Sequence, residues 1–98
     1  GYDSDIDCAE QLIYEAVLHT ENVIDVRSEE EKKHGVLPFA IRLEAFDDSG
    51  IRLLFPLYTK DFSSSFQAAS DVRKKLLKSF SENHIEIPYQ KIEIIEKK

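Results

Sequence analysis

The residues that could do chemistry are few in this sequence, and their spacing forms no recognisable site. The candidates are one cysteine, Cys8, and three histidines, His19, His34 and His84. A catalytic nucleophile needs a base within hydrogen-bond reach and usually stands in a local motif, and none of these positions has one. They also lack the paired spacings typical of zinc sites, such as H-x-x-H or C-x-x-C. We therefore expect no catalytic residue, no metal, no cofactor and no enzymatic activity.

Phosphate and nucleic-acid binding are not indicated either. Three glycines in 98 residues cannot build a glycine-rich phosphate loop. Residues 1–50 carry thirteen acidic and four basic side chains (−9), and residues 51–98 carry six and nine (+3), which sums to the net charge of −6. Nucleic-acid binders concentrate positive charge on one patch. The basic cluster of Arg73, Lys74, Lys75 and Lys78 is better explained as a solvated helix face, so we expect no nucleic-acid partner.

Length and composition predict a single folded domain over residues 1–98. The chain is 42% hydrophobic, which is too apolar for disorder, and a chain of this size needs neither disulfide nor metal to fold. No apolar run reaches the roughly eighteen residues that span a bilayer, and the start does not look like a signal peptide. We expect a soluble segment that is a fragment of a longer protein.

Hydrophobic spacing predicts the order helix, strand, strand, helix, strand. The helices are expected at 4–20 and 64–83, and the strands at 37–46, 51–59 and 89–96. Ser64 and Gln67 match the capping box of a helix start. The turn cluster 47–50 joins the first two strands into an antiparallel hairpin. Residues 23–35 are expected to be a connection. Its polar run 28–35 could form a helical turn but has nothing apolar to hold it, so we expect a mobile, solvated loop.

This order predicts an α+β, ferredoxin-like fold, βαββαβ, whose first strand is largely missing from the chain. Two helices would then cover one face of an antiparallel sheet. The missing strand would lie between the last strand and the second strand of the hairpin, leaving both with unpaired edges, which invite strand exchange. The strand at 89–96 can close onto 51–60 within the chain, or it can pair with another copy. The sequence favours the second arrangement.

The expected sheet also offers a surface for assembly. On its open face we expect Leu54 and Tyr58 beside Arg52 and Lys60. The last strand has three isoleucines within four residues, which need apolar cover on both faces, and exposed apolar strand surface usually marks an interface. We therefore expect self-association through this strand. The expected interface residues are Tyr89, Ile92, Ile94 and Ile95.

Three segments in co-linear order carry a family resemblance. They are YDSDID from Tyr2, FDDSGIRLLF from Phe46 and IEIPYQKIEI from Ile85. Together they resemble the cytoplasmic C-terminal domain of small-conductance mechanosensitive channels, the MscS family. In that family Tyr-Asp-x-Asp begins a helix, a hairpin with a Gly/Ser turn follows, and a second helix leads to Gly-Ile-x-x-Pro-x-Pro. The chain departs from this pattern at Gln90, at Asn83-His84, and at Pro56 inside a strand.

The resemblance implies a non-enzymatic domain of a mechanosensitive ion channel that releases ions and small osmolytes on hypoosmotic shock. The parent would be a homoheptamer in the bacterial inner membrane, with this domain forming part of a vestibule on the cytoplasmic side and not inserting into the membrane itself. The chain after Pro88 would approach the symmetry axis. The alternative is a stand-alone ferredoxin-like, ACT-like regulatory module that binds a ligand; a small enzyme is the third and weakest interpretation.

Overall fold

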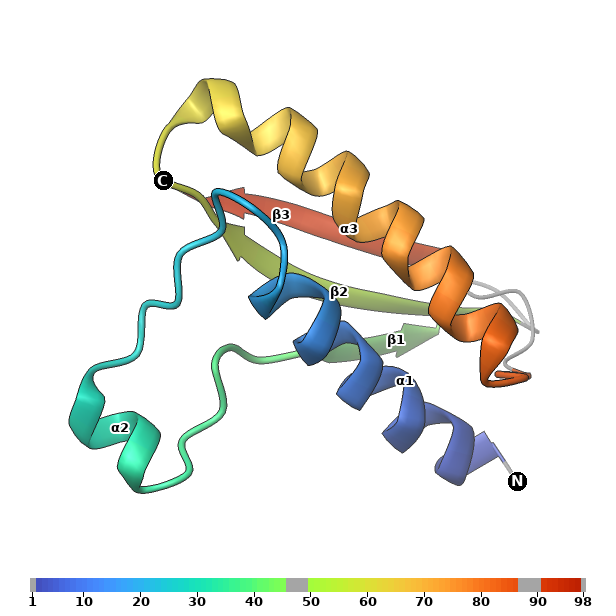
Figure 1. Cartoon of the computed structure of the whole chain (residues 1–98). Helices are drawn as coiled ribbons and strands as arrows, with labels where there is room; N and C mark the ends of the chain where they lie inside the picture. The colour runs from blue at the N-terminus through green and yellow to red at the C-terminus, as the bar shows by residue number, and fades with distance from the viewer. Residues whose placement is uncertain (1, 46–49, 87–90, 98) are drawn as a thin grey trace.

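The chain folds into one three-stranded sheet covered on one face by two helices (Figure 1). The computed structural model describes residues 2–45, 50–86 and 91–97. The elements are α1 (Tyr2–Leu18), α2 (Glu29–Lys33), β1 (Arg42–Ala45), β2 (Ile51–Tyr58), α3 (Phe62–Glu82) and β3 (Lys91–Lys97). The α+β class and the order α-β-β-α-β of the long elements are confirmed, and they are consistent with a truncated ferredoxin-like fold.

Strand β2 occupies the centre of the sheet, in the order β1-β2-β3. It pairs antiparallel with β1, with Arg42 opposite Leu54, and parallel with β3, with Phe55 opposite Ile94. The prediction of an all-antiparallel sheet is therefore wrong. Helix α3 returns the chain to the end of the sheet where β2 began (Figure 1), and such a crossover is what a parallel pair requires.

The gap predicted beside β2 is filled by the chain itself. Strand β3 lies directly against β2 over Lys91–Lys97, so β2 has no unpaired edge. The sequence left two arrangements open, and in the structure the last strand pairs with β2 of its own chain. The preference for pairing this edge of β2 with another copy is therefore wrong. Self-association through the other edge of β3 stays a prediction.

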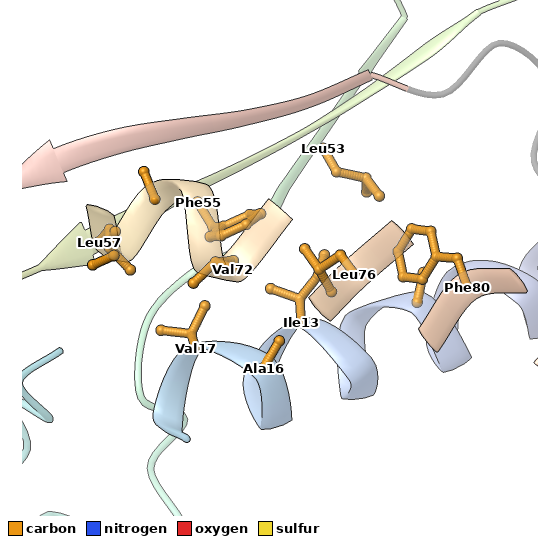
Figure 2. Packing of buried hydrophobic residues seen from close by; sticks show 12 residues of the cluster. Ile13, Ala16, Val17, Leu53, Phe55, Leu57, Val72, Leu76 and Phe80 are labelled. Carbon is orange, nitrogen blue, oxygen red and sulfur yellow. The ribbon is translucent and has the colours of Figure 1, made fainter. Parts of the chain in front are cut away.

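The core lies between the sheet and the two long helices (Figure 2). Alternate residues of β2 point into it, and Leu53, Phe55 and Leu57 are at most 1% exposed. The larger buried side chains include Ile13, Val17, Leu53, Phe55, Leu76 and Phe80. Ile41 is partly buried and packs against this cluster.

Helix α3 begins earlier than predicted because Asp61, not Ser64, caps it. The Asp61 carboxylate accepts hydrogen bonds from the Ser64 backbone N–H at 2.8 Å and from the Ser63 hydroxyl at 2.9 Å. Asp is as good an N-cap as Ser, and with it the helix starts at Phe62, so the predicted capping box at 64–67 is wrong. The buried stripe consists of Ser65, Ala68, Ala69, Val72, Leu76 and Phe80.

Two large apolar residues of α3 lie outside that stripe. Phe66 is 58% exposed and Leu77 is 72% exposed. At about 100° per residue, they fall on the side of the buried stripe that turns away from α1. Phe62, which is 56% exposed, lies on the same side and meets Phe66 edge to face at a centroid distance of 5.0 Å. Helix α3 therefore has a second, exposed apolar side.

Strand β1 is shorter than the predicted strand at 37–46 because Phe39 has a different role. Its carbonyl oxygen accepts a hydrogen bond from the Tyr14 hydroxyl at 3.2 Å. Its ring lies 5.0 Å from the Tyr14 ring and 6.0 Å from the Phe55 ring. Phe39 thus links α1 to β2, and Pro38 just before it has no N–H to give to a ladder. The hairpin is confirmed; residues 46–49 of its turn lie outside the described residues.

The predicted loop at 23–35 contains the short helix α2. Ser28 caps it, because its side chain accepts from the Glu31 N–H at 3.1 Å and its own N–H donates to the Glu31 carboxylate at 2.8 Å. No residue of α2 is buried. The predicted solvation is therefore confirmed. The helical turn that the polar run allowed is present, because a capping box holds it without apolar contacts.

Adjacent leucines of α3 provide a matched test of the helix phase. Leu76 is fully buried, whereas Leu77 is 72% exposed. We expect Leu76→Ala to lower the free energy of unfolding by about 2–5 kcal/mol because it leaves a cavity, and Leu77→Ala to change it by less than about 0.5 kcal/mol. Urea unfolding followed by circular dichroism measures both. Equal costs for the two variants would show that the phase is wrong.

Candidate functional site

The predicted interface strand lies at one edge of the sheet. In the described part of the chain, β3 pairs with β2 and with no other strand. Ile92 and Ile94 are half-buried and pack against the core on the helix-covered face. Ile95 is opposite Pro56 in the register, and Tyr89 lies outside the described residues. The structure therefore brings Ile92 and Ile94 together on one face of β3. On that face they pack against the core formed with the chain's own helices, not against a second copy.

A groove of about 580 Å³ opens beside Ile92, between the end of α3 and the start of β3. Its apolar lining comes from Leu77, Phe80 and Ile85 as well as Ile92, and Arg73, Ser81, His84 and Glu86 add polar groups. Ligand sites of this size are common in proteins. The groove was not predicted, because its lining comes from segments whose relative placement the sequence pattern does not show.

The end of α3, which forms one wall of the groove, is held by a Schellman motif. The Ile85 N–H donates to the Phe80 carbonyl at 3.0 Å, and the His84 N–H donates to the Ser81 carbonyl at 3.2 Å. His84 has a φ of +52°, the left-handed conformation in which glycine is usual. A histidine there costs about 1–2 kcal/mol of backbone strain. The imidazole of His84 therefore lines the groove at a cost in folding stability that glycine would avoid.

The open face of the sheet is covered by ion pairs across the three strands. Glu44 lies 3.6 Å from Arg42 and 3.9 Å from Arg52, and Arg52 lies 4.0 Å from Glu93. Leu54, predicted to be exposed there, is only 6% exposed, because long side chains at its register positions in β1 and β3 can cover it with their stems. Arg52 and Tyr58 are half-buried and Lys60 is exposed.

The predicted basic cluster does not form one patch. Arg73 lines the groove by β3, whereas Lys75 and Lys78 line a second hollow between α1 and α3. The Lys75 ammonium donates to the His19 carbonyl at 2.7 Å and to the Thr20 hydroxyl at 3.1 Å. A cation at this position satisfies the end of α1 and its dipole, so Lys75 has a structural role.

The residues considered for catalysis are dispersed. His19 and His34 each place Nδ1 2.8 Å from a carbonyl oxygen four residues earlier, and both are exposed. Cys8 is a free, half-buried thiol. Within the described ranges, no three side chains of His, Cys, Asp or Glu lie together as metal ligands would.

The segment after α1 is fastened by one ion pair that the sequence did not reveal. The Arg27 guanidinium donates to both carboxylate oxygens of Asp25, at 3.0 and 2.8 Å, and to the Val36 carbonyl at 2.9 Å. The hydrogen bond from the Arg27 side chain is the main cause that lowers the pKa of Asp25 to about 2. Both side chains are less than a quarter exposed. Because Arg27 binds Asp25 and the Val36 carbonyl at the same time, it joins the two ends of the segment from Asp25 to Val36.

Comparison with known proteins gives one match. Residues 1–87 match the family model described as the C-terminal domain of the mechanosensitive ion channel MscS. This range includes both long helices and the hairpin and ends before β3. Searches of curated proteins and of solved structures found no match. Of the helices in the described residues, none is long and apolar enough to cross a membrane.

Replacing His84 should reveal the strain at the end of α3. We expect His84→Gly to raise the free energy of unfolding by about 0.5–1 kcal/mol, because glycine adopts the left-handed conformation without penalty. Ser81→Gly, inside the helix, should lower it by about 0.5 kcal/mol. Urea unfolding of both variants checks the pair. Destabilisation by His84→Gly would mean that the imidazole makes contacts worth more than the strain.

The Asp25–Arg27 pair predicts a dependence on pH. Because the folded-state pKa of Asp25 is lowered from 3.8 to about 2, its ionised form stabilises the fold above about pH 4, and this contribution is lost as the pH falls toward 2. Asp25→Asn should therefore melt at a lower temperature than the wild type at pH 7, with the difference shrinking between pH 4 and pH 2. A difference that is constant over this range would contradict the assignment.

Proposed function

The chain belongs to the family of C-terminal domains of MscS mechanosensitive ion channels, and we propose that it forms part of the cytoplasmic vestibule of such a channel. The observation that carries this proposal is the family match over residues 1–87, which includes α1, the hairpin and α3. In this proposal the chain is the C-terminal part of a longer protein in the bacterial inner membrane. Its task is assembly and filtering, without catalysis.

The partner in this proposal is the chain itself. The parent would be a homoheptamer, with ions and small osmolytes passing through it on hypoosmotic shock. Self-association would use the strand at 89–96, including Tyr89, Ile92, Ile94 and Ile95. The position of β3 at an edge of the sheet supports this, because an edge strand presents backbone groups that a second chain can pair with.

The charge distribution supports a filtering role. Residues 1–50 have a net charge of −9, and the acidic first turn of α2, Glu29, Glu30 and Glu31, is entirely exposed. Acidic groups along an opening raise the local concentration of cations and lower that of anions. If such an opening runs past α2, it would favour cations.

The groove by β3 supports a second candidate, an ACT-like regulatory module that binds a small molecule. Its lining combines apolar side chains with Arg73 and His84, which suits a ligand with an apolar body and one acidic group. Binding of such a ligand by a protein that gives no tension-activated current would favour this alternative over the channel domain.

Channel activity is tested in cells. Bacteria that lack their own mechanosensitive channels should survive hypoosmotic shock when they express the longer protein that carries this chain, and membrane patches should show tension-activated current. Leu76→Ala should reduce survival because it weakens the core of this domain, whereas Leu37→Ala, at a leucine that is 60% exposed and lies outside the proposed contacts, should not. Absence of rescue and of current, with the protein present in the membrane, would overturn the proposal.

A further inference from the structure

Three rows of paired residues cross the sheet, and the two ends of each row are complementary. The rows, read from β1 through β2 to β3, are Arg42–Leu54–Glu93, Leu43–Leu53–Ile92 and Glu44–Arg52–Lys91. The first row ends in a positive and a negative residue, and the third row ends in a negative and a positive one. The middle row has apolar residues at both ends. The two edges of the sheet therefore match each other.

The described residues at these ends are accessible. On β1, the side chains of Arg42 and Glu44 are 63% and 42% exposed, and Leu43 is 48% exposed. On β3, the Glu93 side chain is 42% exposed. Its carboxylate lies 4.0 Å from Arg52, and a carboxylate can accept more than one cationic donor. An exposed leucine beside alternating charges on an edge strand is a surface that strand pairing would cover.

The strand directions also match. Strand β1 runs antiparallel to β2 and β3 runs parallel to it, so β1 and β3 run in opposite directions. A second copy shifted sideways in the plane of the sheet would place its β1 antiparallel to β3 of the first copy. In that arrangement all three rows can continue in register from one copy into the next.

We propose that copies of this chain join edge to edge, β3 of one copy against β1 of the next, in a continuous sheet. The contacts are Glu93 with Arg42 of the second copy, Ile92 with Leu43 of the second copy, and Lys91 opposite Glu44 of the second copy. This inference rests on the proposed self-association and names the two surfaces that make it. Such a head-to-tail contact is the kind that builds rings.

The helix layer supports the same contact. The exposed side of α3 beyond the core carries Phe62, Phe66, Arg73 and Leu77, and Arg73 and Leu77 line the groove beside Ile92. On α1, Asp7 and Glu10 share by their spacing the side of Tyr14, which faces Phe39 near β1. Edge-to-edge joining brings this apolar side of α3, with Arg73 in it, toward the side of the next α1 that carries Asp7 and Glu10, so Arg73 would meet acidic groups and the apolar side chains would be covered.

A two-fold pairing fits less well. Two antiparallel copies of β3 that set Ile92 opposite Ile94 of the second copy also set Glu93 opposite Glu93 of the second copy, and like charges in opposite positions destabilise a sheet. Pairing of β1 with β1 of a second copy would leave β3 uncovered. These two-fold arrangements and the head-to-tail arrangement give different results when variants are mixed.

The test reverses the charge at each edge separately. We expect sedimentation equilibrium of the wild-type chain to show association, and Arg42→Glu and Glu93→Arg each to raise the dissociation constant about tenfold, since attraction becomes repulsion. Lys74→Glu, on the exposed surface of α3, is the control and should leave it unchanged. Leu43→Ser should weaken association without a change of charge. Circular dichroism confirms that each variant is folded.

Mixing the two reversal variants in equal amounts decides the geometry. Each contact between one variant and the other then joins opposite charges, so association should recover most of the lost affinity. A ring of seven would keep one contact between two copies of the same variant, because an odd number of copies cannot alternate. Failure to recover on mixing, reversals without effect, or a wild-type chain that stays monomeric at 1 mM would each overturn the edge-to-edge contact. Hypoosmotic survival tests the channel separately, so a monomeric chain in a protein that rescues cells refutes this interface and leaves the channel proposal standing.

Discussion

Pairing of β2 on both edges is the constraint on which the rest of the structure depends. Its one face supplies Leu53, Phe55 and Leu57 to the core, and its backbone holds β1 on one side and β3 on the other. Helices α1 and α3 are placed by the apolar side chains of this strand. The segment before β1 depends on it too, because the Ile24 N–H donates to the Tyr58 carbonyl at 2.8 Å and Phe39 packs on Phe55.

Elements with a single dominant period could be predicted from the sequence. The alternation over 51–59 predicted β2, and the helical spacing around Val72 and Leu76 predicted α3, because burial on one face fixes the period. The direction of β3 could not be predicted, since alternating isoleucines have the same pattern read either way. The start of α3 was also ambiguous: Asp61 and Ser64 are both good caps, and the choice depends on which helix phase buries more of the core.

The candidate site was less accessible to sequence reasoning than the fold. Ile92 was found because apolar strand residues need cover, but its present cover comes from the chain's own helices. The sequence alone does not mark Arg42, Leu43 or Glu93 as interface residues. Their complementarity appears only once the strand register places them at the two ends of the same rows. The sequence comparison marked His84 as a departure from the family pattern. That departure alone did not indicate that His84 has a left-handed backbone conformation.

The parallel pairing of β3 has a consequence for how the chain is made. The hairpin partners β1 and β2 are close in sequence, whereas β2 and β3 are separated by 32 residues, of which 21 form α3. Distant contacts form late because loop closure costs entropy. Strand β3 is also the last described element to leave the ribosome. Until β3 docks, one edge of β2 has no partner within the chain and can accept a strand from another molecule, so docking of β3 removes a site for strand exchange.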